Sequence, residues 1–135
     1  MVEDAVEAPR APVPGGEERA PVSVAPDVDE VLPAVFGLRS RDLRIYRALL
    51  DRPGATTAEL AAVVGIDRSN VNRSLGQLRE RGLVGRRRRL LPEGGYCYVY
   101  TATAVEEACE LLGEGLDAWT ERARERLRGA LAPEP

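Results

Sequence analysis

The fold is decided by one stretch of the sequence, TTAELAAVVGIDRSNVNRSLGQLRERGLV, which spans residues 56–84. It predicts two short helices joined by a tight turn. Thr56 is followed three residues later by Glu59, the spacing of a capping box, in which each side chain accepts a hydrogen bond from the other residue's backbone N–H. The first helix should therefore begin directly after Thr56 and end at Gly65, which can adopt the left-handed conformation. Asp67 is a favourable N-cap for the second helix.

The second helix, expected over residues 68–81, has two unlike faces. Val71, Leu75 and Leu78 lie on one narrow apolar stripe, with Ser74 beside them. The other side and its edges are polar and cationic, with side chains that can bind base edges or phosphates. An ordinary surface helix would carry more Glu and more opposite-charge pairs here, so we favour a helix that enters the DNA major groove. The candidate DNA-binding side chains of this helix are Arg68, Ser69, Asn70, Asn72, Arg73 and Gln77.

A β-hairpin is expected directly after this helix. Residues 83–91 form a strand-like run, Pro92–Gly95 supplies turn residues, and Tyr96–Tyr100 alternates at period two. A helix-turn-helix followed by a basic hairpin is typical of a winged helix, whose wing lies along the DNA backbone or reaches the minor groove. The sequence therefore predicts a mainly α fold with a small β-hairpin.

Four consecutive arginines lie on the first strand of this hairpin. Arg86 and Arg88 should project from one face and Arg87 and Arg89 from the other, because successive strand residues point to opposite sides. All four therefore cannot make equivalent contacts. The alternative is a solvated strand edge whose charge resists aggregation. Because the run directly follows the proposed recognition helix, we favour a phosphate-contacting role for it and place all four arginines in the DNA-binding set.

Charge is unevenly distributed along the 135 residues, although the net charge is only −3. Residues 1–30 hold eight acidic residues and two arginines, and residues 101–135 hold eight acidic residues and four arginines. Residues 31–100, by contrast, hold thirteen arginines and six acidic residues. The positive charge is therefore confined to the segment expected to bind DNA.

The residue types present exclude several chemistries. All nineteen basic residues are Arg, so there is no His base or ligand, no Schiff-base Lys and no P-loop Lys. Cys97 and Cys109 are too few for a metal site, and we expect both to be small buried hydrophobes rather than redox-sensing thiols. We therefore predict no catalytic residue, no metal, no cofactor and no enzyme activity. The Arg-only basic set and abundant Ala suggest a GC-rich genome.

Three segments are expected along the chain. Residues 1–30 should be a disordered acidic tail, residues 31–103 the winged helix-turn-helix domain, and residues 104–135 a C-terminal dimerisation helix with a short tail. No run approaches the roughly 18 apolar residues of a membrane span, and the acidic N-terminus does not resemble a signal peptide. A cytoplasmic protein without a membrane partner is expected.

The domain should also contain a supporting helix before residue 56. A short apolar segment over residues 31–38 is expected to pack under the domain. Ser40 should then cap a helix over residues 41–51, with Pro53-Gly54 as its stop. Its predicted apolar face comprises Leu43, Tyr46 and Leu50, with Ile45 and Leu49 beside them.

The last segment predicts one long helix. Thr103 and Glu106 have capping-box spacing, and a helical pattern continues toward Ala130. Its apolar residues recur every three or four positions, close to the coiled-coil repeat, so they either fold back on the domain or pair with a second chain. We favour pairing, although Gly113 and Gly115 could mark a bend. The stripe begins with Val105 and Cys109, and its predicted dimerisation residues are Leu112, Leu116, Trp119, Ala123 and Leu127.

Residues 36–84, FGLRSRDLRIYRALLDRPGATTAELAAVVGIDRSNVNRSLGQLRERGLV, together with the hairpin up to Thr103, resemble the winged-helix domain of TrmB-type transcriptional regulators. The MarR group is a broader relative. The resemblance implies a dimer, a recognition helix at residues 68–81 and a wing at residues 85–96. Full-length TrmB regulators continue into a sugar-binding domain that this chain does not reach, so sugar sensing is not implied. Small haloarchaeal regulators of this type would fit the composition.

These observations favour a homodimeric transcriptional regulator that binds double-stranded DNA. The alternative from another class is a winged-helix protein-interaction module of the transcription machinery, because fold alone does not decide function. An exposed polar recognition helix favours DNA, whereas an exposed apolar patch there would favour a protein partner. The residues identify no small-molecule effector.

Overall fold

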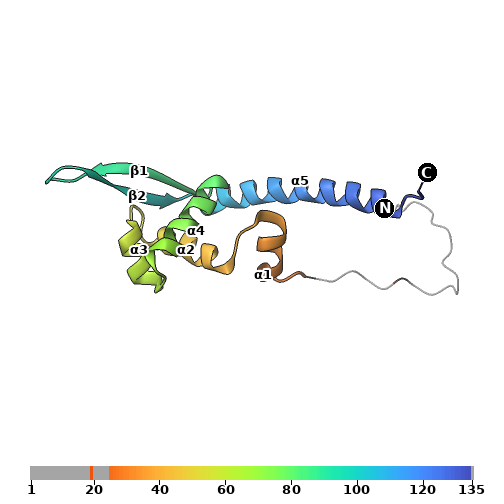
Figure 1. The fold of residues 1–135 in the computed structure, drawn as a ribbon, viewed down its shortest axis with the longest axis horizontal. Helices are drawn as coiled ribbons and strands as arrows, with labels where there is room; N and C mark the ends of the chain where they lie inside the picture. The colour runs from red at the N-terminus through yellow and green to blue at the C-terminus, as the bar shows by residue number, and fades with distance from the viewer. Residues whose placement is uncertain (1–18, 20–24, 135) are drawn as a thin grey trace.

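The computed structural model describes residue 19 and residues 25–134. It is mainly α-helical with one two-stranded hairpin, as predicted (Figure 1). Most of the expected disordered tail lies outside the described residues, and helix begins within its last residues, at Val28. The elements are α1 (Val28–Val31), the π-helical turn η1 (Leu32–Phe36), α2 (Ser40–Asp51), α3 (Thr57–Val64), α4 (Arg68–Glu80), β1 (Val84–Leu90), β2 (Tyr96–Ala102) and α5 (Val105–Leu131).

The ends of α3 and the start of α4 are formed by the predicted caps. Thr56 Oγ1 accepts a hydrogen bond from the Glu59 N–H at 3.1 Å, and Glu59 Oε1 accepts one from the Thr56 N–H at 2.9 Å. Gly65 ends α3 with φ 72°, a left-handed conformation that costs glycine little. Asp67 caps α4 by accepting from the Asn70 N–H at 3.2 Å. Local hydrogen bonding thus specifies this helix-turn-helix.

The predicted stripe of α4 forms the centre of the core. Val71, Leu75 and Leu78 are buried together with Ser74, as expected. They pack in one cluster with Ile45 and Leu49 of α2 and Leu60 of α3. This packing fixes the rotation of α4 about its axis and therefore determines which of its side chains face solvent.

The supporting helix α2 differs from the prediction in two details. It begins one residue earlier, because Asp42 Oδ2 accepts from the Arg39 N–H at 2.9 Å, so Arg39 rather than Ser40 is the N-cap. Leu50 was predicted to lie in the core but is 39% exposed, since the buried face runs through Asp42, Ile45 and Leu49. The shift follows from where α4 packs against α2, which the local pattern does not encode.

The hairpin is held to the helical domain at its base. β1 and β2 are antiparallel, with Val84 opposite Ala102 and Leu90 opposite Tyr96. Tyr100 extends the pairing inward, because its carbonyl accepts from the Gly54 N–H at 2.8 Å and its N–H donates to the Ala55 carbonyl at 2.9 Å. The outer part of the hairpin projects away from the helices (Figure 1). A fixed base and a projecting tip are what a DNA-binding wing requires.

Thr103 was predicted to cap the last helix, but it joins three elements instead. Its hydroxyl donates to the Gly82 carbonyl at 2.6 Å, and its own carbonyl accepts from the Tyr46 hydroxyl at 2.6 Å. The N-cap of α5 is Ala104, with no side-chain cap. Burial, followed by the nearby Cys109 and Glu106, raises the pKa of Tyr46, whose hydroxyl is the donor of this bond.

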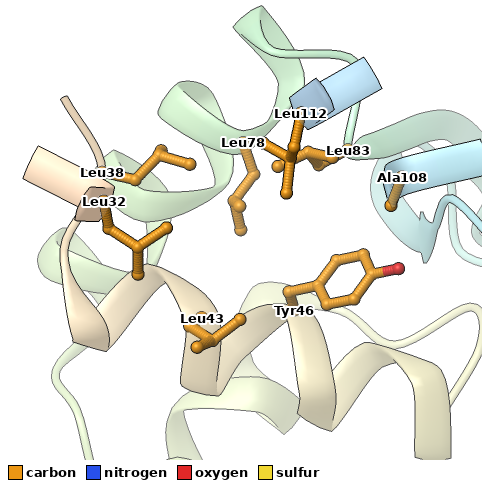
Figure 2. Close-up of a pocket in the computed structure, with 8 residues that line it drawn as sticks. All are labelled: Leu32, Leu38, Leu43, Tyr46, Leu78, Leu83, Ala108 and Leu112. Atoms are coloured by element: carbon orange, nitrogen blue, oxygen red, sulfur yellow. The ribbon is translucent and has the colours of Figure 1, made fainter. Parts of the chain in front are cut away.

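α5 docks on the domain through its first turns and then extends away (Figure 1). Ala108 is buried, and Leu111 and Leu112 pack against the core. Figure 2 shows Ala108 and Leu112 facing Tyr46 of α2, with Leu78 of α4 beside Leu112, around an apolar cavity of about 60 Å³. The helix is continuous over 27 residues, about 40 Å, without the bend that its glycines could have introduced. Its distal half extends beyond the helices and the hairpin of the described part of the chain.

The two interior glycines of α5 differ in their surroundings, which permits a matched test. A Cβ at Gly115 would lie 2.9 Å from Phe36 Cε1, whereas a Cβ at Gly113 would meet nothing within 4 Å. Gly113→Ala should therefore raise the free energy of unfolding by about 0.5–1 kcal/mol through helix propensity. Gly115→Ala should lack this gain, because the Phe36 ring must move.

Urea unfolding at one fixed protein concentration measures both changes. The propensity term is shared by the two variants, so the difference between them isolates the contact with Phe36. Equal stabilisation by the two substitutions would show that α5 does not dock closely at this point.

Candidate nucleic-acid interface

The exposed side of α4 is polar, and most of its predicted DNA-binding side chains are accessible. Arg68, Ser69, Asn72 and Arg73 are exposed. They reach solvent because the opposite side of the helix is buried in the core. α4 therefore presents donors suited to base edges and phosphates rather than an apolar patch.

Asn70, by contrast, is half-buried and its amide is engaged within the protein. Its Oδ1 accepts from Arg73 Nη1 at 2.7 Å and from Arg41 Nη1 of α2 at 3.1 Å. Its Nδ2 donates to Asp67 Oδ1 at 2.7 Å. This side-chain bond, followed by the bond from the Asn70 backbone N–H, lowers the pKa of Asp67. Arg41 was not among the predicted site residues, since nothing in the local pattern links it to a helix about thirty residues away.

Gln77 was predicted to face DNA, but the structure turns it inward. The residue is half-buried, and its Oε1 is fully buried without a hydrogen-bond partner among the described residues. In this conformation Gln77 is not placed to contact a base.

A groove joins the recognition helix to the wing. It is lined by the start of α3, by Arg68 and Asn72 of α4, and by Tyr98 of β2. The Thr57 hydroxyl donates to Asn72 Oδ1 at 2.9 Å, which fixes the amide of Asn72 at the edge of this groove. The two candidate DNA-binding elements are thus adjacent on one side of the molecule.

The four wing arginines are divided into two pairs by their surroundings. The guanidinium carbon of Arg86 lies 4.0 Å from the centre of the Tyr98 ring, and that of Arg88 lies 4.3 Å from the centre of the Tyr96 ring. Arg87 and Arg89 lie opposite Val99 and Cys97 in the register, so they belong to the other face. The predicted alternation is confirmed. The stacking was missed, although period-two pairing of tyrosines with arginines could have revealed it.

The tyrosines are also affected by this arrangement. The rings of Tyr96 and Tyr98 meet edge to face, with their centres 5.5 Å apart. A hydrogen bond with Tyr96, followed by the neighbouring Arg88 and Arg86, lowers the pKa of Tyr98. Stacking on the rings restricts the rotamers of Arg86 and Arg88, which reduces the entropy lost when they bind an anion.

The two cysteines do not both occupy buried positions. Cys97 is half-buried, but Cys109 is exposed, so the prediction of a buried thiol is wrong for Cys109 in the single chain. The reason is the rotation of α5, which docks through Ala108 instead. Among the described residues no group of Cys, Asp and Glu side chains could hold a metal ion. None of the described helices combines the length and apolar character needed to cross a membrane.

The distal half of α5 leaves an apolar stripe uncovered. Leu116 is 42% exposed, Trp119 37% and Leu127 63%, whereas Leu112 is partly buried against the domain's own core. A shallow groove runs beside Trp119, Ala123 and Leu127. The predicted stripe is thus divided: its first part packs on the chain itself, and its second part is available to a partner.

Comparisons with known proteins place the chain among transcriptional regulators. Residues 32–106 match a family model described as "Sugar-specific transcriptional regulator TrmB". The chain is 31% identical over 91 residues to the Methanocaldococcus jannaschii protein named "Uncharacterized protein MJ1503", covering 67% of this chain and 69% of the relative.

Solved structures show the same fold. A possible transcriptional regulator from Methanosarcina mazei Go1 has a TM-score of 0.67 at 24% identity, over 78% of this chain and 89% of that one. TrmBL2, described as an archaeal chromatin protein with a novel mode of DNA binding, has a TM-score of 0.55 at 25% identity. That match covers 75% of this chain and 35% of TrmBL2.

Proposed function

The chain belongs to the TrmB family of winged-helix transcriptional regulators, and from this premise we propose that it binds specific duplex DNA sites as a homodimer. Members of the family are regulators rather than enzymes, so the chain is not an enzyme, as its residues predicted. The observation that carries the proposal is the exposed cationic side of α4 next to an arginine-bearing wing, while the other side of α4 is buried.

The proposed contacts follow from accessibility and donor type. Arg73 reads a base, because an arginine can hold guanine through two hydrogen bonds. Ser69 and Asn72 contact a base edge or a nearby phosphate, and Gln77 would have to rotate outward to join them. Arg68 and the arginine-bearing wing bind the phosphate backbone, which sets affinity and its salt dependence.

A homodimer is proposed because the exposed stripe of α5 requires cover and is suited to pairing with itself. Leu116, Trp119, Ala123 and Leu127 recur at spacings of three and four, as in coiled coils. Exposed charged residues of α5 form ion pairs within the helix itself, between Glu121 and Arg124 and between Glu125 and Arg128. A two-fold dimer would place two recognition helices on half-sites about one helical turn apart.

Selection of bound sequences from a random duplex pool tests specificity. We expect enrichment of a palindrome whose half-sites are separated by about one turn of DNA. A pool that gives no enriched sequence would exclude sequence-specific recognition. Binding without sequence preference would leave a non-specific DNA-binding role, whereas no binding to any duplex would favour an acidic protein partner, the alternative function.

The division of the wing arginines gives a charge-matched prediction. Arg86 and Arg88 share their face with Tyr98 and Tyr100, two of the three β2 residues that border the groove beside Arg68, so this pair should contact DNA. The double variant Arg86→Ala/Arg88→Ala should make the plot of log affinity against log salt less steep by about 2, because two phosphate contacts are lost.

The double variant Arg87→Ala/Arg89→Ala removes the same charge from the other face and is the matched control. It should change the slope by less than about 1. Fluorescence anisotropy with one duplex at several salt concentrations measures both variants. A larger change for the Arg87/Arg89 pair would show that the wing presents its opposite face to DNA.

A further inference from the structure

Arg41, on the first turn of α2, forms two hydrogen bonds with side chains of α4. Its Nε donates to Ser74 Oγ at 2.9 Å and its Nη1 donates to Asn70 Oδ1 at 3.1 Å. Ser74 is fully buried, and the Arg41 side chain is only 21% exposed. The adjacent Asp42 is buried and accepts from the Arg39 N–H, which fixes the turn that carries Arg41. One guanidinium therefore spans two positions, one helical turn apart, on α4.

The hydrogen bond from Arg41 limits how Asn70 can contact a base. An amide oxygen has two lone pairs, and both are occupied, since Arg73 Nη1 also donates to Asn70 Oδ1 at 2.7 Å. Reading adenine would require this oxygen to accept from the base while the amide nitrogen donates to it. The nitrogen already donates to Asp67 Oδ1 at 2.7 Å, so only one of its two hydrogens is free. Asn70 is thus saturated as an acceptor before DNA arrives.

We propose that Arg41 is a positioning residue for DNA specificity. Its hydrogen bond holds the side chain of Asn70, called the hub below, in one orientation, and the hub in turn orients the guanidinium of Arg73 toward a base. The inference rests on the proposed function. Arg73 is exposed, and its guanidinium donates a hydrogen bond to Asn70 Oδ1. An arginine held in one geometry loses less entropy on binding a base and discriminates better between bases than a freely rotating one. Arg41 supplies this order without touching DNA.

The test compares the ratio of the dissociation constants for a selected duplex and a shuffled duplex of equal length and composition. Arg41→Met keeps the length of the side chain but removes its donors. It should lower this discrimination about fivefold to tenfold, part of the value of one good base contact. Binding to the shuffled duplex and its salt slope should not change. Arg44→Met is the matched control, because Arg44 on the same helix donates to the Val64 carbonyl rather than to the hub.

A double-mutant cycle shows whether Arg41 acts through Asn70. Asn70→Ala alone should reduce discrimination about as much as Arg41→Met, and the double variant should show no further loss, because both break one network. Unchanged thermal unfolding verifies the fold of each variant. If Arg41→Met is unstable, Arg41→Lys replaces it; a single ammonium reaches one acceptor, so an intermediate loss is expected.

Several outcomes would overturn the inference. A uniform loss of affinity for both duplexes, with a slope reduced by about 1, would make Arg41 a phosphate contact. Additive losses in the cycle, or a preference for adenine lost at one position in Asn70→Ala, would make Asn70 a base reader in its own right. Equal affinity of the wild-type chain for both duplexes would instead overturn the proposed function itself.

Discussion

Replacement of Trp119 by Ala should convert the proposed dimer into a monomer at micromolar concentration. Trp119 lies in the middle of the exposed α5 stripe, between Leu116 and Ala123, and is the only tryptophan. An aromatic anchor at the centre of an interface contributes a large share of its stability. Truncation of a packed tryptophan costs about 3 kcal/mol or more, which corresponds to a roughly 150-fold weaker association.

Sedimentation over a range of concentrations measures this change in full-length protein. Arg124→Ala is the control, since Arg124 is exposed and pairs with Glu121 at 3.7 Å within the same helix. Exposed pairs of this kind contribute at most about 1 kcal/mol. If the wild-type chain sedimented as a monomer at high concentration, the stripe would have another partner and the proposed dimer would be wrong.

Substitution of all four wing arginines, Arg86–Arg89, by Ala should weaken binding to every DNA sequence. Each lost phosphate contact reduces the salt slope by about 0.9, so the change lies between about 2 and 3, because Arg86 and Arg88 should account for about 2 and the opposite pair for less than about 1. The discrimination between selected and shuffled duplexes should remain, because α4 is intact. Anisotropy with both duplexes gives the two quantities together.

A substitution in α4 should change sequence preference rather than overall affinity. Arg73→Ala should relax the preference at one base position, by about 1–3 kcal/mol, with little change for shuffled DNA. If the wing variant lost discrimination while Arg73→Ala lost affinity uniformly, the roles assigned to wing and helix would have to be exchanged.

Most of the domain could be predicted because its signals are local. The reciprocal bonds of Thr56 and Glu59, the left-handed Gly65 and the cap at Asp67 each depend on residues within one helical turn. The stripe of Val71 with its neighbours follows from helical periodicity alone. The alternation of the wing arginines follows from the geometry of a strand.

The errors arise where a distant element overrides a local signal. Thr103 has the spacing of a cap, but its hydroxyl finds the Gly82 carbonyl, 21 residues earlier. Leu50 has the period of a core residue, but α4 packs on a neighbouring face of α2. Cys109 was expected to be buried, but the docking of α5 through Ala108 leaves its thiol exposed.

The candidate site was predictable by residue type but not by geometry. The exposed positions of Arg68, Ser69 and Arg73 follow from periodicity. The hub at Asn70 does not, because it depends on an arginine 29 residues away in another helix. Helix capping and amphipathicity thus identify the surface, whereas the order within it requires tertiary contacts.

A salt series with wild-type protein and duplex DNA tests the central claim most directly. If the exposed arginines of α4 and the wing displace condensed counterions, log affinity should fall linearly with log salt concentration, with a slope of several units. Affinity that does not change with salt, or no binding to duplex DNA at about 50 mM salt, would contradict a DNA-binding role for this surface.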